Sequence, residues 1–158
     1  VMSFTEHFDA YACEGDAISC EAKGFIVMAR IVADDCLDAP DQRQDGFWPS
    51  LYKDAPGFIG PGNSFRQRFA EAQAKAEAVM EAWRKSEWFY CGIVLSVERD
   101  GIELDRHAAS LWGVECNYPG TDNSYLTTVA NELLPEALDA GRAAASRLAA
   151  TVTGWAAT

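Results

Sequence analysis

The stretch "EWFYCGIVLSVERDGIELDRHAASLWGVECN", residues 87–117, decides the fold. A nearly continuous apolar run rich in aromatic and β-branched residues (residues 88–97) precedes Asp100-Gly101, a dipeptide that favours a two-residue hairpin turn, and a second strand-like segment follows it. The stretch therefore predicts a long β-hairpin. Two adjacent alanines, Ala108 and Ala109, interrupt the alternation in the second arm and indicate a β-bulge.

A second hairpin is expected upstream, in "AISCEAKGFIVMARIVA" (residues 17–33). Its strands are predicted at residues 18–22 and 25–32, because both segments alternate and are rich in β-branched residues. Lys23-Gly24 lies between them, and Gly24 can adopt the positive φ that a tight turn requires. The sequence thus predicts two antiparallel hairpins.

Each hairpin is followed by a helical pattern. In residues 64–85, Ser64 and Gln67 fit a capping box. Apolar residues then recur at helical spacing: Phe65, Phe69, Ala72, Ala76, Val79, Met80 and Trp83. A last helix is expected from Asn123 or Ser124, either of which suits a cap, with Pro135 kinking it or dividing it in two.

The ββαββα order predicts an α+β fold: an antiparallel sheet with both helices on one face, in a single domain spanning residues 1–158. Residues 34–63 separate the halves and hold four of the six prolines and four glycines. They predict a long irregular acidic loop, and loops of this length tend to be functional or poorly ordered.

Charge points to the kind of partner. The formal net charge is -11 and the pI is ≈ 4.5, which disfavours direct binding to nucleic acid. Residues 1–54 hold 11 acidic against 4 basic residues, a balance of -7, and leave -4 for the rest of the chain. Such an asymmetry favours a positively charged partner.

The acidic run consists of Asp34, Asp35, Asp38, Asp41 and Asp45. Three interpretations stay open: a solvated loop, a surface that binds a basic protein, and a Ca²⁺ or Mg²⁺ site, although the spacing misses that of an EF-hand. Trp48 follows the run, either as an interface hot spot or as a plug that pins the loop to the sheet. Trp83, Trp88 and Trp112 are predicted in the core instead.

The stretch "ASLWGVECNYPGTDNSYL", residues 109–126, is rich in turn-forming residues between a strand and a helix. Most of it is explained as a turn and a helix cap. A further hypothesis is that Asn117, Tyr118 and Asp122 present a contact surface at the end of the sheet.

Motifs for catalysis are not found. The glycines of "PGFIGPG" lack the Lys-Ser/Thr of a phosphate loop, and neither GxSxG nor HExxH occurs. A Cys91–His107 pair is disfavoured because Cys91 is predicted in the core and His107 on the surface. Zinc binding by His7, Cys13, Cys20 and Cys36 matches no finger spacing. We therefore expect no catalytic residue, metal or cofactor.

Localisation follows from the cysteines and the apolar runs. Five cysteines without a CxxC pair, and no recognisable signal peptide, favour a reducing bacterial cytoplasm. The apolar runs are shorter than the roughly 20 residues that a membrane span needs.

The quoted hairpin and its continuation to "NYPGTDNSYLTTVANELLPEAL", with "DGFWPS" and "DAPGFIGPG" upstream, resemble a family of uncharacterised small acidic proteins of bacteriophages and plasmids. The resemblance covers most of residues 17–138. It implies a mobile genetic element inside a bacterial cell, and it brings no catalytic residues with it.

The leading hypothesis is a non-enzymatic inhibitor of a bacterial defence complex, of the anti-CRISPR or anti-restriction type. Its acidic surface would mimic nucleic acid and bind a basic protein or nucleoprotein complex of the host. The alternative is an accessory or structural protein that self-associates through "AGRAAASRLAATVTGW", residues 140–155. An enzyme that uses the Asp-rich loop and a divalent ion is the third class.

Overall fold

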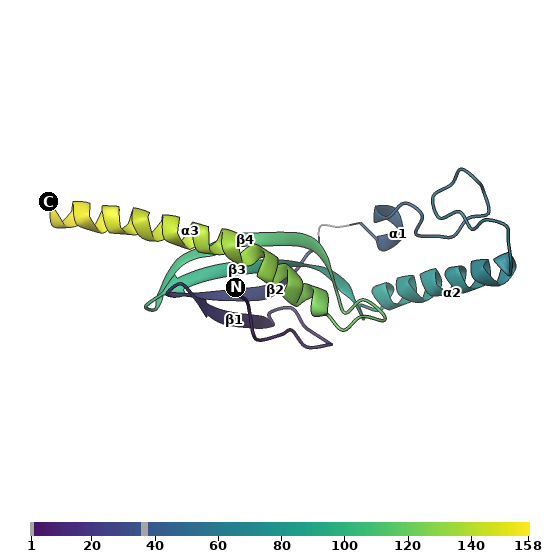
Figure 1. Cartoon of the computed structure of the whole chain (residues 1–158), viewed down its shortest axis with the longest axis horizontal. Coiled ribbons are helices and arrows are strands. Elements are labelled where there is room, and N and C mark those ends of the chain that lie inside the picture. The colour runs from purple at the N-terminus through teal and green to yellow at the C-terminus, as the bar shows by residue number, and fades with distance from the viewer. Residues whose placement is uncertain (1, 36–37) are drawn as a thin grey trace.

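The computed structural model describes residues 2–35 and 38–158 and contains a four-stranded antiparallel sheet in the order β1-β2-β3-β4 (Figure 1). The strands are β1 (Ala17–Ala22), β2 (Phe25–Ala33), β3 (Phe89–Arg99) and β4 (Ile102–Cys116). Both predicted hairpins are confirmed. In each hairpin, the two turn residues have positive φ, as a right-twisted two-residue hairpin requires. The φ values are 51° for Lys23 and 84° for Gly24, and 52° for Asp100 and 78° for Gly101.

The core lies between one face of the sheet and α3 (Ser124–Ala156), which crosses that face (Figure 1). β3 contributes its alternate side chains from Cys91 to Val97, and α3 contributes Leu126, Val129 and Leu134. The approach is close at Gly141, where a Cβ would lie 2.7 Å from Cγ1 of Val97.

The N-terminal segment closes the side of this core. Phe4 and Phe8 are buried, and their backbone N–H groups donate to Oδ1 of Asn131 (2.8 Å) and Oγ1 of Thr127 (3.3 Å) on α3. The segment therefore runs along α3 and shields apolar side chains that the sheet does not cover.

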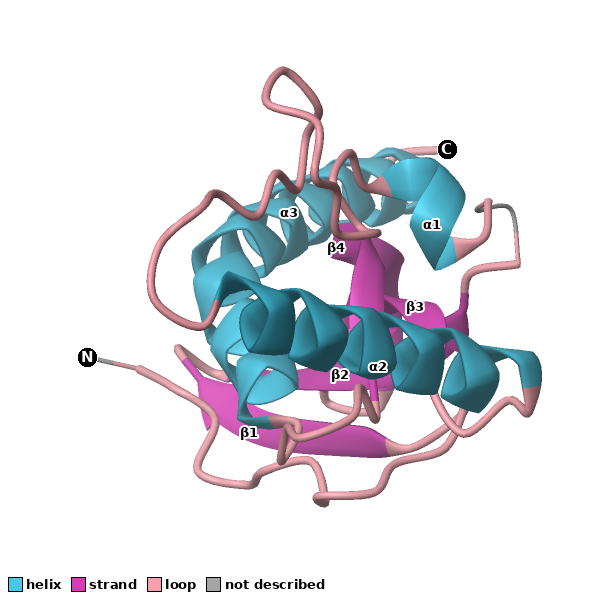
Figure 2. Ribbon diagram, turned by 90° about the vertical axis from the view of Figure 1, so that its right-hand side faces the viewer, coloured by secondary structure: helices cyan, strands magenta, loops and turns pink. Residues whose placement is uncertain are grey.

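α2 (Phe65–Arg84) does not share the face of the sheet that α3 covers. Its buried Val79 and Ala82 form a separate cluster with Trp88 and Tyr90, where β3 begins. Nε1–H of Trp88 donates to the carbonyl of Val79 at 2.9 Å. From there α2 extends beyond the end of the sheet (Figure 1), and in the view from that end it lies in front of the strands (Figure 2). Of the two helices expected on one face of the sheet, only α3 therefore lies there.

Both helices begin where the sequence predicts, but the caps differ. Ser64 has φ +59°, its side chain makes no capping bond, and Gln67 donates to Glu71 instead. Asn123 has φ +64° and also makes no side-chain cap. A capping side chain needs extended backbone at the N-cap, and the left-handed conformation turns it away from the helix. The predicted capping box is therefore wrong.

α3 runs through Pro135 as one helix, so of the two expected outcomes, a kink or a division, the division does not occur. Its C-terminal part extends past the sheet (Figure 1), and Leu148, Val152 and Trp155 are exposed there, Trp155 by 68%.

Residues 38–63 are mostly irregular, as predicted, apart from the short helix α1 (Pro40–Arg43). The loop folds on itself: the N–H of Ser50 donates to Gly57 at 3.0 Å, and the N–H of Ile59 donates back to Ser50 at 2.7 Å. Gly46 packs so closely that a Cβ there would lie 2.7 Å from the backbone nitrogen of Gly57.

Candidate functional site

The pairing of β3 with β4 has three register shifts, and side-chain contacts mark two of them. At the first, the pairing passes from Cys91–Val114 to Ile93–Leu111, which leaves one extra residue in β4. Gly113 lies there with φ +74°. Its N–H donates to Oδ2 of Asp34 at 3.1 Å, so Asp34 supports the sheet from the end of β2.

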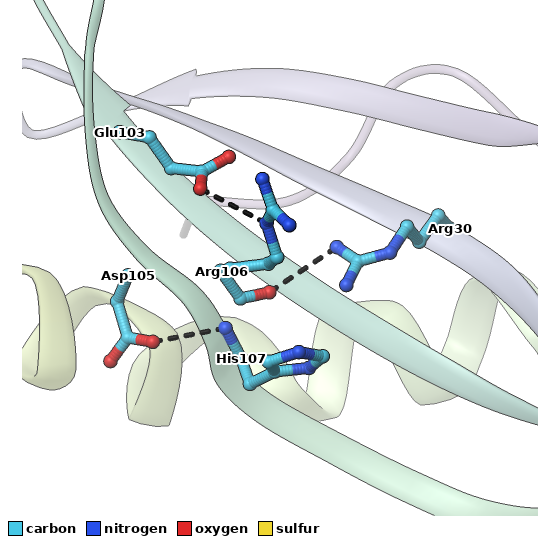
Figure 3. Close-up of polar contacts among 5 residues, drawn as sticks. All are labelled: Arg30, Glu103, Asp105, Arg106 and His107. Carbon is cyan, nitrogen blue, oxygen red and sulfur yellow. Dashed lines mark hydrogen bonds and ion pairs between the residues drawn. The ribbon is translucent and has the colours of Figure 1, made fainter.

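The second irregularity lies between Asp105 and Ala109, which pair with Val97 and Leu95. It coincides with the bulge predicted at Ala108 and Ala109, and both alanines are buried. Figure 3 shows Arg30 of β2 donating to the carbonyl of Arg106 at 3.2 Å. Arg30 of β2 and Asp34, directly after β2, thus each satisfy a backbone group at one of these two irregularities.

The residues around this second bulge form local contacts. Arg106 pairs with Glu103 at 3.1 Å, and Oδ1 of Asp105 accepts the N–H of His107 at 2.9 Å (Figure 3). His107 is exposed, whereas Cys91 is buried against α3. A hydrogen bond with Cys116 and burial raise the pKa of Cys91, so its thiol is not activated.

The acidic run divides into supporting and exposed residues. Asp34 is half-buried, and Asp41 accepts a hydrogen bond from Nε1–H of Trp48 at 3.3 Å. Asp35, Asp38 and Asp45 are exposed. Within residues 2–35 and 38–158, no hydrogen bond or ion pair involves these three side chains.

Ion pairs lie elsewhere. Those of the described residues join Lys85 to Glu81, Arg106 to Glu103 and Arg142 to Asp139. Each joins residues three or four positions apart in the chain, and none of them involves Asp35, Asp38 or Asp45.

Trp48 is half-buried and packs edge-to-face on Phe47, with ring centroids 5.3 Å apart. Its hydrogen bond to Asp41 joins α1 to the loop that follows. The indole supports the loop rather than reaching the sheet core.

A groove of ≈ 940 Å³ lies where β4 ends and α3 begins; we call it the sheet-end groove. Its walls are Leu111, Trp112, Gly113, Val114, Glu115, Tyr118, Gly120, Thr121, Asp122, Asn123, Ser124 and Tyr125. Three aromatic side chains and two carboxylates line it. None of these lining residues is basic.

Trp112 is not a core residue as predicted but is 47% exposed in this groove. Its ring lies over Gly92, where a Cβ would come within 2.3 Å of it. The irregularity at Gly113 breaks the two-residue alternation, which is why periodicity misplaced the indole.

Asn117 has a structural role. Its Oδ1 accepts the N–H of Ala12 at 2.8 Å and its Nδ2 donates to the carbonyl of Ala12 at 2.7 Å. Oδ1 of the buried Asn123 accepts the N–H of Asn117 at 2.8 Å. Through Asn117, these contacts join the N-terminal segment to Asn123, which is a residue of the groove wall. Asn117 itself does not line the groove.

Tyr118 and Asp122 do line the groove. The Tyr118 ring packs edge-to-face on Trp88, 4.9 Å between centroids, and is therefore held in place. Asp122 is exposed and accepts the N–H of Ser124 at 3.0 Å, which lowers the pKa of Asp122. Of the three residues predicted as a contact surface, these two meet in one groove.

Glu115 was not singled out by sequence reasoning, although it is the charged residue at the end of an apolar strand. In the register of β3 and β4, Glu115 lies opposite Tyr90. The guanidinium carbon of Arg43 lies over the Tyr90 ring, 4.3 Å from its centroid. Burial raises the pKa of Glu115 and Arg43 lowers it. Arg43 of α1 therefore lies close to Glu115, a residue of the groove wall.

Metal ligands do not gather in groups of three or more His, Cys, Asp or Glu within residues 2–35 and 38–158, and Cys36 of the suggested zinc set lies outside them. No helix in this part of the chain has the length and apolarity to cross a membrane. No protein-family model, curated protein or solved structure matches the chain.

Proposed function

We propose that this protein is a non-enzymatic inhibitor that binds a basic protein of a bacterial defence complex, such as a CRISPR effector or a restriction enzyme. One observation carries the proposal: Asp35, Asp38 and Asp45 are exposed, and no cation of the described chain neutralises them. The bacterial setting is itself part of the proposal, because it rests on the resemblance inferred from the sequence, for which the comparisons found no match.

The geometry supports a pre-formed acidic surface. Arg43 holds α1 on Tyr90, and Asp41 accepts a hydrogen bond from Trp48, so the part of the acidic run from Asp41 to Asp45 is braced. In a chain of net charge -11, unpaired carboxylates create a negative potential that steers a basic partner into contact. Asp34 and Asp41 contribute as supports, and the exposed three contribute the charge.

Plating efficiency of a targeted phage tests this proposal in bacteria that carry one defined CRISPR or restriction system. Expression of the protein should raise plating, and Asp35→Asn/Asp38→Asn/Asp45→Asn should abolish the effect. The matched control, Glu71→Gln/Glu132→Gln/Glu136→Gln, removes equal charge from exposed helix positions and should retain it.

In vitro, the protein should block nucleic-acid binding by the purified complex at low salt and less so at high salt, because salt screens exposed charges. Equal activity of the two triple variants would show that the acidic run is not the surface. No change in plating with any defence system would remove the proposal itself.

A second candidate function, self-association as an accessory protein, is favoured by the projecting end of α3. Leu148, Val152 and Trp155 are exposed, yet their spacing continues the face that Gly141 and Ala144 bury against the sheet. Sedimentation velocity over a wide concentration range tests it. A concentration-dependent dimer that Trp155→Gln abolishes supports this function, and a monomer throughout excludes it.

A further inference from the structure

We infer that the sheet-end groove binds the guanidinium or ammonium group of an Arg or Lys side chain presented by a partner polypeptide. This inference rests on the proposed function and deepens it, because it assigns the position at which a basic partner is recognised.

The lining is complementary to an organic cation. Glu115 and Asp122 supply carboxylates, and Trp112, Tyr118 and Tyr125 supply aromatic rings. A cation is attracted to the face of such rings, most strongly to Trp. Trp112 and Tyr125 are 47% and 58% exposed, so their surfaces are open to a ligand.

The groove also begins at the N-terminus of α3, whose partial positive charge favours anions. That charge amounts to about half a unit, and the Asp122 carboxylate already accepts the N–H of Ser124. Two carboxylates against about half a positive unit leave the groove negative. Arg43 offsets Glu115 in part but does not line the groove.

The groove is organised before a ligand arrives. Tyr118 is held on Trp88, and Trp112 is held over Gly92. Asn123 lines the groove and is fixed by bonds to Asn117 and to the carbonyls of Asp9 and Ala10. A pre-organised site loses less conformational entropy on binding.

A guanidinium group of the chain itself already lies on an aromatic ring near the groove. The guanidinium of Arg43 stacks on Tyr90, 4.3 Å from the ring centroid, beside the carboxylate of Glu115. The lining of the groove offers an incoming guanidinium the same two kinds of group, exposed aromatic rings and carboxylates.

Titration of the full chain with N-acetyl-arginine methylamide tests the inference, followed by proton–nitrogen correlation NMR. The Trp112 indole N–H and the amides of Glu115 and Tyr125 should shift. The citrulline analogue, equal in shape but uncharged, should leave them unchanged. Equal shifts with both compounds, or none with the arginine compound, would overturn the inference.

Variants locate the site. Glu115→Gln and Asp122→Asn should each weaken binding of the arginine compound about three- to fivefold, the upper range for a partly exposed ion pair. Asn at position 122 still offers an oxygen to Ser124, so the start of the helix is kept. The control Glu136→Gln, exposed on α3, should bind as the parent does. Equal weakening by all three variants would point to net charge alone and overturn the inference.

Failure of the two proposals is distinguishable. If Asp35→Asn/Asp38→Asn/Asp45→Asn abolishes inhibition while the groove gives no arginine shift, the inference fails and the inhibitor remains. If the arginine compound binds but no defence system is inhibited, the inhibitor fails and the groove remains a cation site.

Discussion

Oδ2 of Asp34 accepts the backbone N–H of Gly113 at 3.1 Å, across the intervening strand β3. This bond joins the first residue of the acidic run to the wall of the sheet-end groove. It also satisfies the N–H that the bulge in β4 withdraws from β3.

Asp34→Ala should lower the free energy of unfolding by about 1–3 kcal/mol, because it leaves a half-buried N–H without an acceptor. Asp34→Asn should cost less, since its amide oxygen can still accept. The control Asp35→Ala, at an exposed neighbour, should stay within about 0.5 kcal/mol of the parent. Urea unfolding measures all three, and equal stability of Asp34→Ala and Asp35→Ala would contradict the assigned role.

Gly141→Ala should destabilise the protein by about 1 kcal/mol. The added methyl meets Val97 at 2.7 Å, an overpacking cost of about 1–3 kcal/mol that exceeds the gain of about 1 kcal/mol in helix propensity. Gly154→Ala is the matched control in the same helix, because nothing lies within 4 Å of its Cβ position. Thermal unfolding should move in opposite directions for the two variants.

Glu115 predicts a pH dependence. Burial is the main cause that raises the pKa of its carboxyl above the usual glutamate value. The folded state then binds more protons than the unfolded state between the usual and the raised pKa, so stability falls as pH rises through that window. Glu115→Gln should reduce the fall and be slightly more stable than the parent at neutral pH. Urea unfolding across this pH range checks the sign, and a steeper fall in the variant would refute it.

Asn117→Ala should release the N-terminal segment. It removes the two bonds to Ala12 and the one from Asn123, and should cost about 1.5–4.5 kcal/mol, at about 0.5–1.5 kcal/mol for each bond. Hydrogen exchange of the Ala12 amide should accelerate far more than that of Ile93 in the centre of the sheet. Equal protection of the Ala12 amide in the variant and the parent would show that other contacts hold the segment.

The hairpins were predictable because Lys23-Gly24 and Asp100-Gly101 are local signals, and the backbone of a two-residue turn is decided by those residues. Helix positions were predictable because apolar residues at helical spacing are also a local signal. The caps were not, since Ser64 and Asn123 adopt a left-handed backbone, and the contacts that hold Asn123 reach back to Asp9 and Ala10.

The site was predictable only in part. Tyr118 and Asp122 stand out as unusual residues in a turn, and they do line the groove. Trp112 and Glu115 were missed because a bulge shifts the side-chain alternation, and one extra residue leaves only a weak trace in the sequence. The support that Asp34 gives to Gly113 joins residues of two hairpins and has no local signature.

α3 starts at the sheet-end groove and continues for 33 residues, a rod of roughly 50 Å. Trp155 lies near its far tip. A partner bound at the groove and a second partner bound near Trp155 would be too far apart to collide, so one molecule would hold both partners at once. A fluorescent label placed at the tip would likewise follow events at the groove without obstructing them.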